Sequence, residues 1–228
     1  MSGPCEPARW QKAHAGAAYE LYPPLQQRGL LHGLIVRQPG VEVSLDRAET
    51  LKALRPSHER ILSVALPAGQ TPHTAEQVHG SEVALAEEAA GRSHAGADAL
   101  ISAQPGAALG IYVADCCAVF LWDSERRAVG LVHSGAKGTA SGIVPRALER
   151  MGQVFGCVPR RMVAVLSPCI RPPLYETDFA AEVRRQCVDA GVGAVWDGGE
   201  CTGSDLDRFY SYRMERGRTG RMLAFVAL

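Results

Sequence analysis

Residues 109–138 read LGIYVADCCAVFLWDSERRAVGLVHSGAKG, and this stretch contains three short apolar runs separated by polar turns. The runs are rich in β-branched and aromatic side chains, as buried strands are; they are Leu109–Val113, Val119–Trp122 and Ala128–Val132. The first run is followed by Asp115 and Cys116, and the third by His133. Polar groups at strand ends face a crevice more often than they face packing. The stretch therefore predicts a β-rich core with a functional crevice at its edge.

Helices and further strands are expected on both sides of this stretch. A short helix is predicted over Asp46–Leu54, with Asp46 as N-cap, Glu49 in the capping-box position and Pro56 as its end. Longer helices are predicted over Ser141–Phe155, with Pro145 in the first turn, and over Asp178–Ala190. Other predicted strands are Leu30–Val36, Ile61–Leu66, Thr74–Val78, Ala99–Ser102 and Met162–Leu166, with a closing pair at Phe209–Tyr212 and Met222–Leu228. Strands in clusters and in alternation with helices favour an α+β fold with mixed β-sheets layered with helices.

Length and composition fit one domain over residues 1–228, with residues 1–29 as a partly irregular N-terminal segment. Lysine plus arginine and aspartate plus glutamate each total 24, so the zero net charge gives no case for nucleic acid or a membrane surface as partner. No long apolar run and no signal-like N-terminus exist, which predicts a cytoplasmic protein. Seven irregularly spaced cysteines argue against a secreted disulfide framework.

Three residues in turn-like motifs form a candidate metal site: His79 in EQVHG, Cys116 in ADCC and His133 in VHSGAKG. Two imidazoles and a thiolate suit zinc, and three protein ligands leave the fourth tetrahedral position for water or substrate. Such a vacancy is typical of catalytic zinc. The ordinary alternative is that the histidines are surface turn residues and the cysteine fills core space.

Six blocks of the sequence resemble those of the laccase-domain, or YfiH-like, family. They are EQVHG, GADALIS, ADCCAVFLWD, VHSGAKGTASGIV, SPCIRPPLYE and the tail CTGSDLDRFYSYRMERGRTGRM. The resemblance implies a YfiH/CNF1-like fold and a zinc site at His79, Cys116 and His133. Family members have been called polyphenol oxidases or laccases, purine nucleoside phosphorylases with adenosine deaminase activity, and peptidoglycan editing factors.

Two departures from the family pattern concern the substrate. Where the family usually has tryptophan and arginine, this chain has Ala136 and Lys137, so an aromatic face is lost and a point charge replaces a guanidinium fork. The family's long loop after the first strand is also missing between Gly40 and Asp46. Arg37, in a position like the family's early arginine, is left to supply a cation from that side.

Functional expectations follow from the zinc chemistry and the resemblance together. Zinc-bound hydroxide at neutral pH suits attack on an aryl carbon that bears an amine, and the metal could instead orient phosphate for attack on a ribosyl carbon. We therefore expect a zinc-dependent purine nucleoside enzyme: a phosphorylase acting on adenosine, inosine or methylthioadenosine, with adenosine deamination as a further activity. Its partners would be small molecules, a nucleoside and phosphate, and the chain would be a monomer or homodimer.

Three alternatives stay open. Cys116 could be the activated nucleophile, rather than a ligand, of an amidase or cysteine-type hydrolase that edits a peptidoglycan precursor. The chain could also be a metal-binding homologue without activity, or a copper polyphenol oxidase. Copper is less attractive because electron-transfer copper sites need additional soft or histidine ligands.

Accessory residues can be named around the metal motif. Asp115, next to Cys116, is the candidate acid–base or ligand-orienting group, although it could equally be a turn residue; Asp98 in GADALIS is expected to be structural. The loop GAKGTASG, with Gly135, Lys137 and Gly138, could bind phosphate through its amides and Lys137. A tight turn is its ordinary alternative. Arg213, Arg218 and Arg221 in the tail are expected to form a solvated hairpin rather than a substrate clamp.

Overall fold

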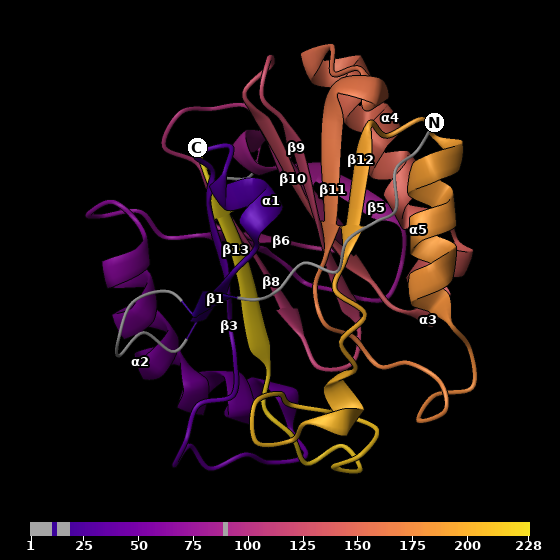
Figure 1. Cartoon of the computed structure of the whole chain (residues 1–228). Helices are drawn as coiled ribbons and strands as arrows, with labels where there is room; N and C mark the ends of the chain where they lie inside the picture. Colours follow the sequence, from indigo (N-terminus) through magenta and orange to yellow (C-terminus); the bar gives the residue numbers. More distant parts are fainter. Residues whose placement is uncertain (1–10, 13–18, 89–90) are drawn as a thin grey trace.

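The computed structural model describes residues 11–12, 19–88 and 91–228, which form one α+β domain of four layers (Figure 1). Helix α2 (Arg47–Ala65) covers the outer face of a seven-stranded sheet. A six-stranded sheet packs on the inner face of the first sheet, and helices α4 (Ile143–Phe155) and α5 (Phe179–Asp189) cover its far side. The layered α+β prediction is confirmed.

Both sheets are mixed. The seven-stranded sheet has the order β1 (Gln11–Lys12), β2 (Tyr19–Leu21), β3 (Leu31–Ile35), β13 (Met222–Ala227), β8 (Ala108–Val113), β4 (His73–Ala75) and β6 (Ser93–His94). The six-stranded sheet has the order β12 (Ala194–Asp197), β11 (Met162–Leu166), β9 (Cys117–Asp123), β10 (Ala128–Ser134), β7 (Ala97–Ser102) and β5 (Glu82–Leu85). Parallel pairs β4–β8, β4–β6, β5–β7 and β11–β12 lie among antiparallel ones. The short helices are α1 (Pro23–Gln26) and α3 (Ala136–Ala140), with 3-10 turns at Ala86–Glu88, Pro159–Arg161 and Thr202–Ser204.

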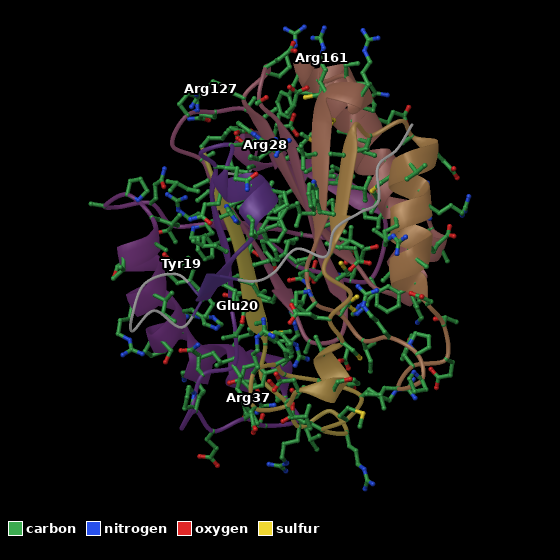
Figure 2. The ribbon with its side chains drawn as sticks, in the orientation of Figure 1. Tyr19, Glu20, Arg28, Arg37, Arg127 and Arg161 are labelled. Carbon is green, nitrogen blue, oxygen red and sulfur yellow. The ribbon has the colours of Figure 1, made fainter. Side chains whose placement is uncertain are left out.

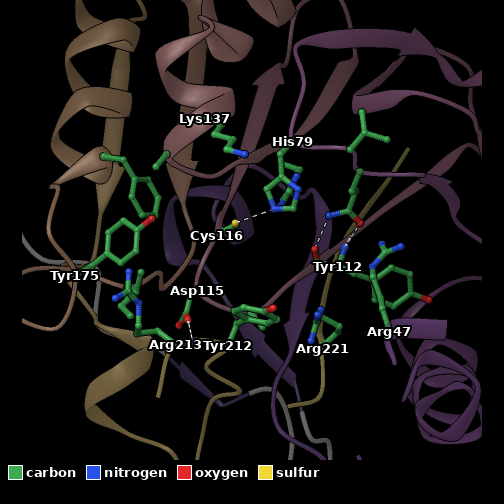
Figure 3. A pocket seen from close by; sticks show the side chains of 17 residues that line it. Arg47, His79, Tyr112, Asp115, Cys116, Lys137, Tyr175, Tyr212, Arg213 and Arg221 are labelled. Carbon is green, nitrogen blue, oxygen red and sulfur yellow. Dashed lines mark hydrogen bonds between the residues drawn. The ribbon is translucent and has the colours of Figure 1, made fainter. Parts of the chain in front are cut away.

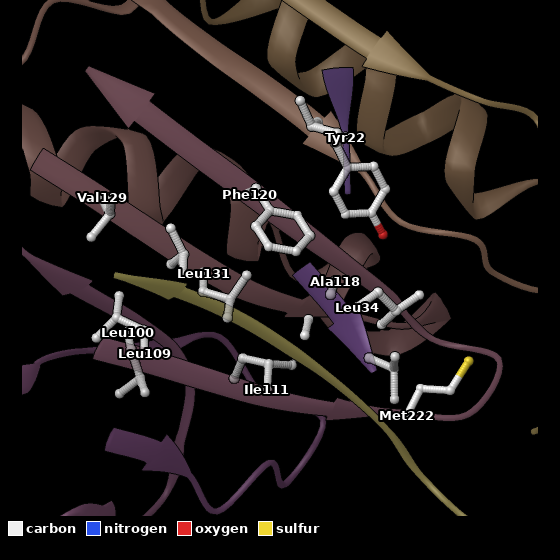
Figure 4. Close-up of a cluster of buried hydrophobic side chains, with 14 of the residues drawn as sticks. Tyr22, Leu34, Leu100, Leu109, Ile111, Ala118, Phe120, Val129, Leu131 and Met222 are labelled. Atoms are coloured by element: carbon white, nitrogen blue, oxygen red, sulfur yellow. The ribbon is translucent and has the colours of Figure 1, made fainter. Parts of the chain in front are cut away.

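The main core lies between the two sheets. Phe120 of β9 and Leu131 of β10 face Leu109 and Ile111 of β8, and all four side chains are buried (Figure 4). Burying one such side chain contributes about 1.5–3 kcal/mol. The intervening residues of β9 and β10 face α4 and α5 on the other side of the six-stranded sheet, so both faces of this sheet are apolar. This explains why its strands read as nearly continuous apolar runs in the sequence.

The β9–β10 hairpin carries the polar residues to the edge of this core. In its antiparallel ladder His133 pairs with Ala118, and Ser134 pairs with Cys117. His133 is buried, and strand alternation places it on the same face as Leu131, between the two sheets. Cys116 lies in the turn between β8 and β9, immediately beside the end of β10.

The predicted N-terminal caps of two helices are confirmed. Asp46 accepts a hydrogen bond from the Glu49 backbone N–H at 2.8 Å and caps α2. Asp178 accepts one from the Ala181 N–H at 2.9 Å and caps α5. Helix α4 begins at Ile143 rather than at residue 141, because α3 precedes it, and Pro145 lies in its first turn as predicted.

Four sequence predictions were wrong. Pro56 does not end α2, which continues to Ala65, so the predicted strand Ile61–Leu66 is mostly helix. The buried side chains of this helix pack on the seven-stranded sheet, and that packing outweighs the backbone hydrogen bond that proline removes. The predicted strand Phe209–Tyr212 is a loop, and β13 pairs instead with β3 and β8. The predicted strand Thr74–Val78 ends at Ala75.

The N-terminal segment predicted as partly irregular is described only in part. Residues 1–10 and 13–18 lie outside the described residues, while β2 and α1 follow within residues 19–29. Over the part of the chain that is described, no helix has both the length and the apolar character that crossing a membrane requires.

Candidate metal centre

His79, Cys116 and His133, here called the ligand trio, converge in the structure. Figure 3 shows His79 and Cys116 pointing towards each other. One donor atom from each lies within 4.8 Å of the others, and Cys116 Sγ is 3.9 Å from His79 Nε2. The two imidazole rings are 4.9 Å apart between centroids. Tetrahedral zinc holds such donors about 3.3–3.6 Å apart. Only a small closure of the trio would therefore match a zinc ion, and the residues fit this metal.

Asp98 of β7, fully buried, organises both histidines of the trio. Its Oδ1 lies 2.8 Å from His133 Nδ1 and accepts a 2.9 Å hydrogen bond from the His79 backbone N–H. Its Oδ2 accepts bonds from the N–H groups of Gly80, at 2.7 Å, and Val78, at 3.2 Å. Burial alone would raise the pKa of Asp98, but the bonds from His133 and Gly80 hold it below its ordinary value. A carboxylate at Nδ1 leaves Nε2 of His133 free to bind a metal.

The EQVHG loop is held in a conformation that the sequence pattern did not predict. Gln77 and His79 have φ values of 64° and 62°, in the left-handed region that such residues rarely adopt. The Gln77 carboxamide anchors the loop, because its Nε2 donates to the Tyr112 carbonyl and its Oε1 accepts from the Tyr112 N–H at 3.0 Å. The hydrogen bonds to Asp98 hold the other half of the loop. Together these bonds aim the exposed His79 ring at Cys116.

Cys116 fits only because residue 135 is glycine. A Cβ on Gly135 would lie 2.6 Å from Cys116 Sγ, closer than such atoms approach. Burial raises the pKa of the Cys116 thiol to about 12, with the Asp115 charge as a further cause. The neighbouring Cys117 is buried on the other side of the strand, as expected from alternation.

Asp115 joins loops and does not contact the imidazoles. Its Oδ1 accepts from the Thr202 hydroxyl at 2.7 Å, and its Oδ2 accepts from the Arg213 backbone N–H at 2.7 Å. It thereby ties the turn before β9 to the C-terminal tail. The carboxylate on the histidines belongs to Asp98, which the sequence analysis assigned to structure. The acid–base role of Asp115 stays a prediction.

A pocket of about 700 Å³ opens onto the ligand trio. Its aromatic lining consists of Tyr112, Tyr175, Phe179 and Tyr212. Its basic lining consists of Arg47, Lys137, Arg213 and Arg221, with Asp115 as the acidic side chain among the described residues that line it (Figure 3). The trio therefore faces a space with flat apolar walls and an excess of positive charge.

The predicted phosphate residues are only partly brought together. Lys137 is exposed and lines the pocket, whereas Gly135 and Gly138 pack against Cys116 Sγ and the Gly80 carbonyl. Arg37 is outside the pocket lining, near the foot of the view in Figure 2. Its guanidinium pairs with Glu215 at 2.8 Å and lies 4.3 Å from the centre of the Tyr210 ring.

Three pocket arginines, Arg47, Arg213 and Arg221, were not assigned to the site from the sequence. Arg213 and Arg221 were expected in a solvated hairpin, but both line the pocket, and Arg221 is half-buried. Arg47 is the first residue of α2, directly after the N-cap, and Arg221 directly precedes β13. Such boundary positions are the one sequence signal that could have suggested them, since element ends border clefts.

The sequence matches the family model described as multi-copper polyphenol oxidoreductase laccase over residues 40–187 and 175–228. A purine nucleoside phosphorylase of Deinococcus radiodurans is 37% identical over 178 residues, which cover 67% of this chain and 68% of the relative. A purine nucleoside phosphorylase of Corynebacterium glutamicum is 31% identical over 181 residues, covering 67% of this chain and 72% of the relative.

Two solved structures have the same fold. YlmD from Geobacillus stearothermophilus superposes with a TM-score of 0.80 at 24% identity, covering 97% of this chain and 99% of that one. The hypothetical protein YfiH of Bacillus licheniformis gives a TM-score of 0.81 at 22% identity, covering 96% and 98%. At these identities the likeness concerns the fold alone.

Proposed function

The chain belongs to the laccase-domain, YfiH-like family, and from that premise we propose that it is a zinc-dependent purine nucleoside phosphorylase. The observation that carries the proposal is the convergence of His79, Cys116 and His133 on one side of a pocket with aromatic and cationic walls. The names of the relatives support the reaction class, and the ligand trio supports the metal dependence.

The donor set supports zinc over copper. Within the described part of the chain, the metal-capable group consists of the three residues of the ligand trio, which suits a tetrahedral ion with one open position. A multi-copper centre needs more histidine or thioether ligands than this group offers. Zinc bound there would supply an electrophilic centre facing the pocket. His133 and His79 would hold it through the orientation that Asp98 imposes.

In the proposed reaction, the bond between the ribosyl C1′ and the purine nitrogen breaks, and a bond between C1′ and a phosphate oxygen forms. The electron pair of the broken bond leaves with the purine, which takes up a proton. Tyr175, Phe179 and Tyr212 offer faces on which a purine ring can stack. The exposed Lys137 ammonium lines the pocket and offers a positive charge beside the ligand trio. Burial and the His133 ring lower the pKa of His79, and the Lys137 charge adds to this.

The expected substrates are adenosine, inosine and methylthioadenosine, with deamination of adenosine as a second activity. Aromatic side chains in the pocket offer stacking faces for the adenine and hypoxanthine rings of these three nucleosides. Replacement of the 6-amino group by the oxygen of water, with release of ammonia, would convert adenosine to inosine. The monomer or homodimer state and the cytoplasmic location stay predictions.

An amidase that uses Cys116 as nucleophile is the second candidate, because its Sγ lies 3.9 Å from a histidine nitrogen that could accept its proton. Chelation separates the two candidates. A phosphorylase that depends on zinc loses its activity with the metal and regains it on repletion, whereas a cysteine nucleophile keeps working without metal.

Purified protein with a measured zinc content tests the proposal. We expect adenosine, inosine and methylthioadenosine to release free base only when phosphate is present, with ribose 1-phosphate or its methylthio analogue formed in equal amount. Chromatography follows the bases, and phosphorus NMR follows the sugar phosphate. His79→Ala should remove both the metal and the activity. Fully zinc-loaded protein that releases no base in the presence of phosphate would refute the proposal.

A further inference from the structure

We propose that Arg47 and Arg221 form a subsite for a tetrahedral phosphate group within the pocket, a placement that deepens the proposed function and rests on it for the identity of the nucleoside. Arg47 comes from the start of α2 and Arg221 from the residue before β13, so distant parts of the chain bring the two guanidinium groups to one wall. In Figure 3 they lie together on one side of the pocket, and Lys137 lies on another.

The charge of the pocket lining contrasts with that of the chain. The whole sequence has equal numbers of basic and acidic residues, 24 of each, whereas the described pocket lining has four basic side chains and one carboxylate. The guanidinium of Arg213 is already neutralised by Glu176, through bonds of 2.7 and 2.8 Å. The Asp115 carboxylate is engaged by Thr202 and a backbone N–H. An excess of cations without matching carboxylates favours an anionic ligand.

Arg221 is held in a way that leaves it ready for such a ligand. Its Nη1 donates to the Thr219 and Gly220 carbonyls at 3.2 and 2.8 Å, so one edge of the half-buried guanidinium is fixed by backbone. A guanidinium has five N–H donors in a planar fork that matches a phosphate oxygen pair. Among the described residues no carboxylate pairs with it. Burial and the neighbouring charge of Arg47 both lower the pKa of Arg221, as expected for a desolvated guanidinium with a like charge nearby.

Arg47 supplies the second fork from a rigid position. It is the first residue of α2, where the Asp46 cap fixes the backbone, and its exposed side chain forms no ion pair with the residues that the structure describes. Two arginines from different elements can each bind two phosphate oxygens, which gives a geometrically specific site.

The glycine loop after β10 is less suited to this role. A Cβ on Gly135 would clash with Cys116 Sγ at 2.6 Å, and one on Gly138 would lie in tight contact with the Gly80 carbonyl at 3.2 Å, so both glycines serve the packing of the ligand loops. Of this loop, Ala136 and Lys137 line the pocket. The loop therefore contributes one flexible ammonium, whereas the opposite wall contributes two planar forks.

The phosphate group could belong to inorganic phosphate, the second substrate of a phosphorylase, or to a phosphate ester on the nucleoside. The shared chemistry is the tetrahedral oxyanion. Inorganic phosphate and adenosine 5′-monophosphate are therefore the two probes.

Equilibrium binding of each probe to the zinc-loaded full chain, measured by calorimetry, tests the subsite. We expect Arg47→Gln and Arg221→Gln each to weaken binding by about tenfold or more, since each removes charge-assisted bonds. Arg221→Lys should give an intermediate loss, because it keeps the charge but not the fork. Arg60→Gln, an exposed change on the same helix, is the matched control and should leave binding within about twofold of the unchanged protein. Circular dichroism and melting temperature show which variants are folded; Arg47→Gln alters an exposed side chain and keeps the test valid if Arg221→Gln unfolds.

Weaker inorganic phosphate binding in both glutamine variants assigns the subsite to free phosphate, and weaker binding of the monophosphate alone assigns it to an ester. Unchanged binding of both probes in folded Arg47→Gln overturns the subsite. Because no turnover is needed, failure of the proposed function gives a different result: a protein that binds phosphate through these arginines but releases no base is not a phosphorylase and still has the subsite.

Discussion

The ligand trio and the Arg47–Arg221 pair line the same pocket, but they are held in different ways. The trio stands on strand ends and a tight loop, and four contacts to the buried Asp98 carboxylate hold its two histidines. The arginine pair consists of long side chains that reach the pocket from a helix start and from the tail. A metal needs donor atoms placed to within fractions of an ångström, whereas guanidinium groups bind an anion through charge together with their planar forks. One wall therefore supplies donor atoms for a metal, and the other wall supplies positive charge.

The most damaging way to break this contrast is Asp98→Ala. It leaves three backbone N–H groups and the His133 ring without their buried acceptor, so we expect a loss of about 3–5 kcal/mol in unfolding free energy. Zinc affinity should fall by about 10–100-fold or more. Urea denaturation and metal analysis measure the two effects. Asp98→Asn, which keeps the volume and part of the acceptor capacity, should lose less of both; a variant Asp98→Ala with normal zinc content would show that the carboxylate does not position the trio.

Asp115→Ala should affect the opposite wall. Loss of the acceptor for Thr202 and for the Arg213 N–H loosens the tail that carries Arg221, and we expect about 2–3 kcal/mol of destabilisation. Phosphate binding should weaken while zinc content stays unchanged, as measured by calorimetry and metal analysis. Thr202→Val, which removes one of the two bonds, should give a smaller effect. Zinc loss with unchanged phosphate binding would contradict this division between the walls.

Gly135→Ala sharpens the contrast without touching a charge. The new Cβ meets Cys116 Sγ at 2.6 Å, and because residue 135 has an ordinary negative φ, the effect is steric. We expect about 1–2 kcal/mol of destabilisation and reduced zinc affinity, with phosphate binding unaffected. Gly91→Ala is a suitable control, since a Cβ added to Gly91 would meet no atom within 4 Å. Normal zinc affinity in Gly135→Ala would show that the Cys116 thiol does not depend on the space beside Gly135 to bind the metal.

A pH-dependent effect on stability concerns His58 of α2, which stacks on Tyr112 with 5.9 Å between ring centres. Burial lowers the pKa of His58 from 6.5 to about 4, so the unfolded chain takes up a proton first as the pH falls. Stability should therefore decline between pH 6.5 and 4, by about 1.4 kcal/mol per pH unit at most for this residue. His58→Phe, which keeps a ring, should reduce the difference in unfolding free energy between pH 7 and pH 5. An unchanged difference would show that His58 is solvated. Burial also lowers the pKa of His32 to about 4, and His32 contributes equally to the pH dependence of stability in the unchanged protein and in His58→Phe.

The parts of the fold that were predictable from sequence are those decided by local chemistry. Asp46 and Asp178 cap helices through their own side chains, and apolar runs such as Leu109–Val113 form strands because both faces are buried. The end of α2 was not predictable locally. Proline at position 56 ends an isolated helix, but here packing against the seven-stranded sheet carries the helix beyond it.

At the candidate site, the sequence predicted which side chains could bind a metal better than it predicted which residues each polar side chain contacts. The ligand trio was proposed from donor chemistry and resemblance, and the structure brings its donor atoms together. Asp98 and Asp115 look alike in the sequence, and only tertiary contacts show which of them meets the histidines. The sequence analysis placed Arg37 at the site and Arg221 outside it, whereas Arg221 lines the pocket and Arg37 does not. The pairing of Arg37 with Glu215 depends on loops distant in sequence and was not predictable.

The register of β9 and β10 has a consequence for how the protein reaches a working state. His133 shares a face with the inter-sheet core, whereas its neighbours Val132 and Ser134 face the opposite side. A slip of one residue in the strand pairing would turn the imidazole towards α4. It would also move every side chain of the slipped strand to the opposite face of the sheet, where its neighbours no longer match it. Chains that misassemble this ladder would thus be unstable as well as unable to bind metal, so quality control that recognises unstable chains would also remove those that cannot hold the ion.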